Sequence, residues 1–425
     1  MKRILALWCL IILLTISGCA QIPAALQQLR SEVVAAITPT EPAPTAAPTA
    51  PPTEPLTEPP TVPPTECEPT QPPDYVTSLI QSMSLREKVG QLFIVHPDSL
   101  VAPPDDPEDC IKAFTPELAE GLKKYPVGGF VMFSENITSP TQITVFNESL
   151  QANSAIPLFL CVDEEGGLVA RLANHKAFDL PKYRNAATVG KSGNPDKALE
   201  MGRTIGAYLN EYGFNTNFAP VADVNTNAKN TVIGTRAFSP NPETAAKMAS
   251  AMAEGLREQG IIATFKHFPG HGDTAEDSHD ALAVSKKTAE ELAACEWIPF
   301  RSATENDFVM MGHIALPVFH GNRTPASMSR EVVTGILREQ LGFEGLVITD
   351  SLEMGAVTAL YDSGEAALTA LQAGCDILLM PANLPAAFES IVEAVENGQY
   401  SQEQLDATLE RILRFKERHG MLGIG

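Results

Sequence analysis

Residues 345–350, with the sequence GLVITD, form an almost continuous apolar and β-branched run that ends in a carboxylic acid. An uninterrupted apolar run of this length is typical of a strand that is buried on both faces, as in a parallel sheet. Runs of the same character lie at residues 89–95, 127–133, 157–163, 215–224, 263–268, 308–314 and 376–380. The chain therefore has eight candidate strands for one parallel sheet.

Helical patterns lie between most of these runs. Amphipathic stretches occupy residues 197–211, 242–259, 289–306, 331–341 and 363–373, and capping boxes are expected at 84–87, 288–291 and 401–404. Alternation of eight strands with helices predicts an α/β fold, specifically a (β/α)₈ TIM barrel. A doubly wound open sheet is the alternative, although no dinucleotide-binding or Walker A motif supports a nucleotide site.

The N-terminus has the features of an export signal. Lys2 and Arg3 precede an apolar run over residues 4–16, which is too short to span a hydrocarbon core of ~30 Å. Small residues then precede Cys19, as in the bacterial lipobox, in which the cysteine becomes lipidated after cleavage. An ordinary signal peptide with a chance cysteine is the alternative. We expect a lipoprotein signal over residues 1–18 and a protein held at the outer face of the cell membrane only by lipid on Cys19.

Composition separates the rest of the chain into a linker and a globular domain. Proline, threonine and glutamate dominate roughly residues 38–73, and such a composition favours an extended polyproline II spacer. We therefore expect a lipid-anchored linker over 19–73 and one catalytic domain over 74–425. The net charge of −22 argues against a nucleic-acid partner. The cysteines show no disulfide framework, although Cys67 and Cys110 could pair, and a monomer is the default expectation.

Ionisable residues collect where the expected strands end. These residues are Asp163 with Arg171 beyond it, Asp223 with Arg236 beyond it, Lys266, His267, His313 and Asp350. The carboxyl ends of barrel strands meet at one face, where active sites lie. Buried charges are costly unless they are paired, so a chance gathering of this size is difficult to explain structurally. The pattern predicts an enzyme.

The densest group of polar residues is residues 266–279, KHFPGHGDTAEDSH. Asp277 and His279 are two residues apart, so the carboxylate could orient the imidazole for proton transfer. A solvated loop histidine is the structural alternative, and a metal site formed by His267, His271, Asp277 and His279 is a rival. A glycine-rich loop lacks the rigid spacing of a helical metal motif, so we expect neither a metal nor a cofactor.

KHFPGHG at 266–272, followed by DSH at 277–279, resembles the signature of the β-N-acetylhexosaminidases of glycoside hydrolase family 3. Further stretches match in the same order: SLREKVGQL at 84–92, DEEGG at 163–167, FAPVADV at 218–224, GTRAF at 234–238 and VITDSLEM at 347–354. The resemblance covers about residues 77–420. It implies a TIM barrel and retaining hydrolysis of terminal, non-reducing β-linked N-acetylglucosamine.

The resemblance also implies roles for individual residues. Asp350 would be the nucleophile, and His279, oriented by Asp277, would replace the usual second carboxylate as general acid/base. Sugar would be bound by Asp163, Arg171, Arg236, Lys266 and His267, with Asp223 and His313 nearby. Many relatives have arginine in place of Leu168.

The expected substrate is a muropeptide fragment of peptidoglycan or a chitin oligosaccharide. Three alternatives remain open at this point. They are a β-glucosidase or β-xylosidase of the same family, a metal-dependent hydrolase on the same barrel, and a non-catalytic sugar-binding lipoprotein.

Overall fold

The computed structural model describes residues 74–102, 110–274, 282–320 and 324–423. The predicted signal, Cys19, the linker, Asp277 and His279 lie outside the described residues. Within the described ranges, no helix is both long and apolar enough to cross a bilayer. Cys161, Cys295 and Cys375 are free thiols, and Cys161 and Cys375 are buried in the core. The predicted pairing of Cys67 with Cys110 involves a residue outside the described ranges.

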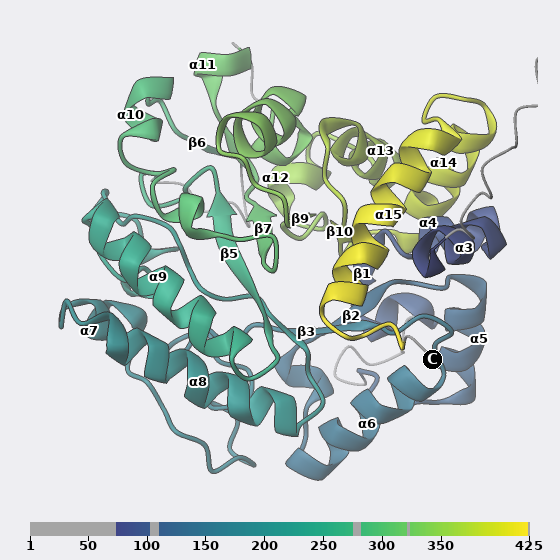
Figure 1. Ribbon diagram of the computed structural model, residues 1–425, viewed down its shortest axis with the longest axis horizontal. Helices are drawn as coiled ribbons and strands as arrows, with labels where there is room; N and C mark the ends of the chain where they lie inside the picture. Colours follow the sequence, from purple (N-terminus) through teal and green to yellow (C-terminus); the bar gives the residue numbers. More distant parts are fainter. Residues whose placement is uncertain (1–73, 103–109, 275–281, 321–323, 424–425) are drawn as a thin grey trace, which may run out of the picture. The chain divides into compact units, whose positions relative to one another are not determined.

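Eight parallel strands form one sheet, which closes on itself (Figure 1). They are β1 (Phe93–Val95), β2 (Gly129–Met132), β3 (Phe159–Val162), β4 (Thr216–Asn217), β5 (Ile262–Phe268), β7 (Phe308–Met311), β9 (Leu346–Thr349) and β10 (Leu378–Leu379). β10 pairs with β1, and a parallel bridge between Ile348 and Ile377 joins β9 to the residue before β10. This closure confirms the predicted (β/α)₈ TIM barrel.

Helices surround the strands (Figure 1). The longer ones are α3 (Tyr75–Ser82), α5 (Pro116–Lys124), α6 (Pro140–Ala152), α8 (Pro195–Glu211), α9 (Pro242–Arg257), a π-helix (Glu331–Gln340), α13 (Ser363–Ala373), α14 (Leu384–Glu396) and α15 (Gln402–Arg418). Shorter ones are α4 (Leu85–Gly90), α7 (Ala186–Gly190), α10 (Ala289–Ala293), α11 (Pro317–His320) and α12 (Gly355–Thr358). The three predicted capping boxes are present at the N-termini of α4, α10 and α15.

Several predicted elements are wrong in extent. The expected strand over 89–95 begins only at Phe93, because its first residues belong to α4, and the expected strand over 308–314 ends at Met311. The expected helix over 289–306 is α10, which ends at Ala293, followed by a short 3₁₀ segment, Pro299–Ser302. The expected strand over 215–224 stops after Asn217, and Pro220 follows without a donor for the sheet ladder. A second small sheet, β6 (Ala283–Val284) with β8 (Ile314–Ala315), was not predicted.

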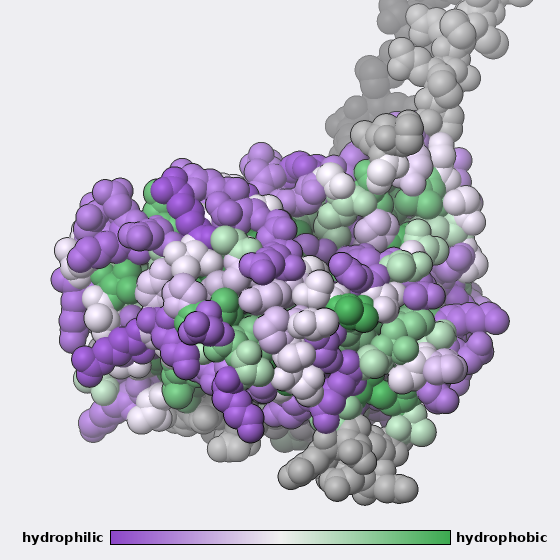
Figure 2. Space-filling view, turned by 90° about the horizontal axis from the view of Figure 1, so that it is seen from below, coloured by the Kyte–Doolittle hydropathy of each residue, from purple (hydrophilic) through white to green (hydrophobic). Residues whose placement is uncertain are grey.

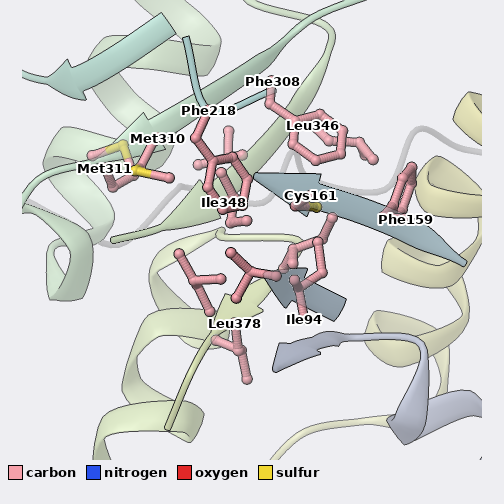
Figure 3. Close-up of a cluster of buried hydrophobic side chains, with 14 of the residues drawn as sticks. Ile94, Phe159, Cys161, Phe218, Phe308, Met310, Met311, Leu346, Ile348 and Leu378 are labelled. Atoms are coloured by element: carbon pink, nitrogen blue, oxygen red, sulfur yellow. The ribbon is translucent and has the colours of Figure 1, made fainter. Parts of the chain in front are cut away.

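Apolar side chains fill the interior of the barrel. Figure 3 shows Phe159, Phe308, Leu346 and Ile348 directed toward one another from β3, β7 and β9. The rings of Phe159 and Phe308 meet edge to face with centroids 5.2 Å apart. The outer surface is different, because hydrophilic side chains cover much of the face in Figure 2 and hydrophobic ones form smaller groups between them.

The seam between β9 and β10 is held by a buried carboxylate. Asp376 is fully buried immediately before β10, and its Oδ2 accepts a hydrogen bond of 2.8 Å from the backbone N–H of Val347 in β9. The same carboxylate pairs with the guanidinium groups of Arg338 and Arg411, the second at 2.8 Å. A single side chain thus ties both seam strands to the π-helix and to α15.

We expect Asp376→Asn to lower the free energy of unfolding by about 3 kcal/mol, because it leaves two guanidinium groups without their buried partner. Guanidinium chloride unfolding followed by circular dichroism measures the change. Glu258→Gln, which breaks the exposed pair between Arg203 and Glu258 on the helical surface, should leave the unfolding midpoint nearly unchanged. Equal midpoints for Asp376→Asn and the wild type would contradict the assigned role of Asp376.

Candidate active site

A cavity of about 240 Å³ opens at the carboxyl ends of the strands. Its wall includes the charged or imidazole side chains of Asp163, Glu165, Arg171, Arg236, Lys266, His267, His271, Asp350 and Glu353. Apolar side chains complete it, among them Phe133, Val169, Phe218 and Met354. The cavity therefore gathers residues from loops after most of the strands, as a barrel active site does.

The ammonium group of Lys266 lies between two carboxylates at one side of the cavity. Its Nζ is 2.7 Å from Asp163 Oδ1 and 2.7 Å from Glu165 Oε1. Burial alone would lower the pKa of Lys266, but the two carboxylates outweigh it and the pKa lies above the ordinary value. Lys266 is therefore a fixed cation that joins the ends of β3 and β5.

Glu165 also holds Arg236 in a two-point ion pair. Arg236 Nε and Nη2 donate to the two Glu165 oxygens at 2.8 and 2.7 Å. Burial opposes ionisation of Glu165, but Lys266 and Arg236 hold the pKa of its carboxyl well below the ordinary value. The fork geometry orients Arg236 toward the cavity at the end of a short 3₁₀ segment, Gly234–Arg236.

The loop after β3 turns back on itself and returns Arg171 to the strand end. Gly166 and Gly167 have φ values of +80° and +89°, which favour glycine, and the N–H of Arg171 donates to the carbonyl of Asp163 at 3.2 Å. The Arg171 guanidinium lies 5.0 Å above the ring of Phe133 and 3.5 Å from Asp163 Oδ2. Its Nε is buried with no hydrogen-bond partner among the described residues.

Glu164 has a structural part in this loop. Its carboxylate is fully buried and accepts hydrogen bonds from the N–H groups of Leu172 and Ala173 and from the hydroxyl of Tyr208, at 2.8, 3.0 and 2.9 Å. Burial raises the pKa of Glu164 despite these donors. The neighbouring acids thus point in different directions, since Asp163 and Glu165 line the cavity and Glu164 fastens the loop behind it.

Asp223 lies behind the cavity wall and orients His267, near the end of β5, and the backbone of His271 in the loop that follows. It is fully buried, and its carboxylate accepts from His267 Nδ1 at 2.7 Å and from the backbone N–H of His271 at 2.6 Å. Burial opposes ionisation, but the two histidines hold the pKa of Asp223 below its ordinary value. Because an ionised carboxylate only accepts, His267 must donate from Nδ1, and this fixes its ring.

Asp350 follows β9 and lies half-buried at the cavity. Its Oδ1 accepts a 2.8 Å hydrogen bond from the N–H of Ser351. Burial would raise its pKa, but His267, His313 and the Ser351 N–H together hold the pKa below its ordinary value of 3.8. The carboxylate is therefore ionised over the whole neutral range, as a nucleophile requires.

His313 supports Asp350 from behind and is not among the residues that line the cavity. It is fully buried, and its Nε2 donates to the Ser351 carbonyl at 2.9 Å while its Nδ1 meets Ser327 Oγ at 2.8 Å. Burial lowers the pKa of His313, so the imidazole is neutral and the Ser327 hydroxyl donates to Nδ1. Its contacts position the backbone that follows Asp350.

The structure brings most of the sequence-predicted residues together. Asp163, Arg171, Arg236, Lys266, His267 and Asp350 line one cavity, whereas Asp223 and His313 lie directly behind it. Asp223 and His313, which were expected near the sugar, are fully buried on other protein groups and can position the lining residues. Asp277 and His279 fall outside the described residues.

Three of the charged or imidazole side chains that line the cavity were missed by the sequence reasoning, namely Glu165, His271 and Glu353. Glu165 lies in the same strand-end group as Asp163, and His271 lies in the KHFPGHG stretch, so both had a signal nearby. Glu353 lies three residues after Asp350 in a turn, where only the local geometry shows that it reaches the cavity. Within the described ranges, no cluster of three His, Cys, Asp or Glu side chains is arranged to hold a metal ion.

Several known proteins are similar to this chain in sequence. β-Hexosaminidase A of Pseudoalteromonas piscicida is 33% identical over 341 residues, which are 73% of this chain and 57% of that protein. The chain thus spans little more than half of that relative. β-Hexosaminidase LpqI of Mycobacterium tuberculosis is 31% identical over 348 residues, which are 79% of this chain and 83% of that protein.

A solved structure supports the same assignment. The family 3 β-N-acetylglucosaminidase of a Paenibacillus species superimposes with a TM-score of 0.73 and 34% identity, over 81% of this chain and 64% of that one. The family described as glycosyl hydrolase family 3 N terminal domain matches residues 84–415. The barrel, the cavity and these matches all support one assignment. The chain belongs to glycosyl hydrolase family 3, a family of glycosidases.

Proposed function

We propose that this protein is a retaining exo-β-N-acetylglucosaminidase, which removes terminal non-reducing β-linked N-acetylglucosamine from oligosaccharides. The observation that carries the proposal is an ionised carboxylate, Asp350, in a cavity of about 240 Å³. This volume is below the range of about 300–1,000 Å³ for drug-sized ligands, and it suits a single sugar ring. The names of the β-hexosaminidase relatives support the choice of sugar.

The proposed reaction is a double displacement. An Asp350 oxygen attacks C1 of the sugar as the bond from C1 to the leaving oxygen breaks, and His279 donates a proton to that oxygen. Water then attacks C1 of the glycosyl-enzyme while His279 takes its proton, and the bond to Asp350 breaks. Two inversions at C1 retain the β configuration.

The paired charges on the wall supply the hydrogen bonds that hold the sugar. Lys266, Arg236 and Arg171 offer N–H donors, and Asp163 and Glu165 offer acceptors, all at fixed positions because they are bound to one another. Such preorganised groups lose little entropy when the substrate binds. The hydroxyl and acetamido groups of the sugar both donate and accept hydrogen bonds, so they match a wall that carries donors and acceptors.

We propose that the protein acts outside the cell, attached by lipid on Cys19 and separated from the membrane by residues 19–73. The lipobox-like sequence before Cys19 and the proline-rich composition of the linker support this location. An enzyme placed in this way would act on wall fragments or on environmental chitin oligosaccharides.

We expect Asp350→Ala to lower kcat for p-nitrophenyl β-N-acetylglucosaminide by at least about 10³-fold, because the proposed nucleophile is lost and the carboxylates of Asp163 and Glu165 are bound to cations. Release of p-nitrophenol measures the loss. Azide should restore turnover in the variant and yield the α-configured glycosyl azide, since the small anion attacks C1 from the vacated side.

A matched control is Asp196→Ala, which removes an exposed carboxylate from α8 and should leave turnover unchanged. Wild-type turnover in Asp350→Ala would show that the nucleophile is another residue. Absence of turnover in the folded wild-type protein would contradict the proposed function and would direct the assay to β-glucosides and β-xylosides.

The pH dependence of kcat/KM separates the two proposed catalytic groups. Because the pKa of Asp350 is held below 3.8, the acidic limb should fall below that pH and activity should persist through pH 5. A basic limb should also be present, because His279 must be protonated to donate its proton to the leaving oxygen.

Hydrolysis of N,N′-diacetylchitobiose between pH 3 and 9 gives the profile. His279→Gln should remove the basic limb and reduce the rate at its optimum. An unchanged basic limb in this variant would exclude His279 as the proton donor.

A further inference from the structure

The cationic side chains that line the cavity are already paired. Lys266 is bound by Asp163 and Glu165, Arg236 by both oxygens of Glu165, and Arg171 lies 3.5 Å from Asp163. These three cations offer N–H groups to a neutral sugar, and Asp163, Glu165 and Asp350 match them in number on the wall. The described part of the wall therefore has no excess positive charge for an acidic ligand, even before Glu353 is counted.

Glu353 differs from the other residues that line the cavity, because it alone among them is exposed to solvent. It lies in a turn between Asp350 and α12, which the Met354 N–H closes by donating to the Ser351 carbonyl at 3.2 Å. Its carboxylate makes no hydrogen bond or ion pair with any residue in the described ranges. Glu353 is thus a carboxylate at the mouth of the cavity with no cation bound to it.

One titratable group, His96, acts on Glu353 but is itself paired with another carboxylate. His96 acts on Glu353 electrostatically, but the Nδ1 of His96 is 2.7 Å from Asp98 Oδ2. Any positive charge on His96 is therefore shared with a second carboxylate. Asp98 is in turn held by the N–H of Ile111 and the amide of Asn136, so the pair is a fixed part of the loop after β1.

An exo-acting enzyme places its leaving group at this mouth. The terminal sugar occupies the closed part of the cavity with C1 at Asp350, so the rest of the oligosaccharide must extend outward to solvent. Glu353 lies only three residues from Asp350 and on the exposed side. Among the described residues, Glu353 therefore places a carboxyl group on the side where the leaving group extends. Partial burial raises the pKa of Glu353, and His96 opposes that rise.

We propose that Glu353 selects the leaving group, favouring neutral and cationic sugars such as N-acetylglucosamine and glucosamine over acidic sugars such as N-acetylmuramic acid. This inference rests on the proposed function and deepens it, because it names the class of oligosaccharide that the enzyme prefers. The net charge of −22 acts in the same direction, since long-range repulsion slows the approach of anionic substrates. Neutral and partly deacetylated chitin oligosaccharides fit this class, whereas muropeptides do not.

Three disaccharides test the proposal with the full-length protein at pH 7 and low salt. Each carries β-1,4-linked N-acetylglucosamine at its non-reducing end, and the second sugar is N-acetylglucosamine, glucosamine or N-acetylmuramic acid. The wild type should have its lowest kcat/KM for the acidic disaccharide. Glu353→Gln should raise kcat/KM for the acidic relative to the neutral disaccharide by about three- to fivefold, as expected for one charge at a solvated rim.

Glu353→Lys should move the ratio further in the same direction and should lower kcat/KM for the glucosamine disaccharide. Added salt at 0.5 M should reduce the wild-type differences, because it screens exposed charges. The matched control is Glu339→Gln, an exposed carboxylate near the end of the π-helix, on the opposite side of the barrel from the mouth. It should leave all three ratios unchanged.

The outcomes separate the two proposals. If the wild type releases N-acetylglucosamine but Glu353→Gln changes all three kcat/KM values by one common factor, the role of Glu353 is wrong and the glycosidase remains. A wild-type preference for the muramic acid disaccharide would overturn the inference in the same way. If the folded wild type cleaves none of the disaccharides and no aryl glycoside, the proposed function fails, and this inference fails with it.

Discussion

Closure of a parallel sheet is the constraint on which the rest of this structure depends. Parallel strands all run in one direction, so joining β9 to β10 brings the carboxyl ends of eight strands into a single ring. The buried carboxylate of Asp376 secures that seam by bonding to β9 and to two arginines. Residues separated by almost 190 positions, such as Asp163 and Asp350, meet at one cavity because the sheet closes.

Charge balance decides how the cavity can be used. Buried carboxylates and cations are tolerated because they neutralise one another, and this pairing also fixes their positions. Asp350 differs from them, because its pKa is lowered by His267, His313, the Ser351 N–H and Lys266, while none of the cations in the described residues forms a direct ion pair with it. A carboxylate without a cationic clamp keeps its lone pairs available for attack at carbon, whereas Asp163 and Glu165 are committed to holding Lys266 and Arg236.

Residues behind the cavity wall make specific hydrogen bonds that position the residues of the wall. Asp223 fixes the ring of His267, and His313 holds the Ser351 carbonyl beside Asp350. Neither side chain lines the cavity, although both lie at strand ends in the sequence. The end of a strand therefore predicts the neighbourhood of a side chain but not its direction, because short strands and the loops after them can turn a residue into the wall or away from it.

The sequence alone determined the fold class, since eight buried apolar runs alternating with capped helices leave few arrangements for a parallel sheet. It also located Asp163, Lys266 and Asp350 at strand ends, because the hydrophobic pattern marks where each strand stops. Only the tertiary structure decided that Glu165 clamps two cations and that Glu353 lies at the mouth. Those assignments depend on which side chains face each other across the barrel, and spacing along one chain does not contain that information.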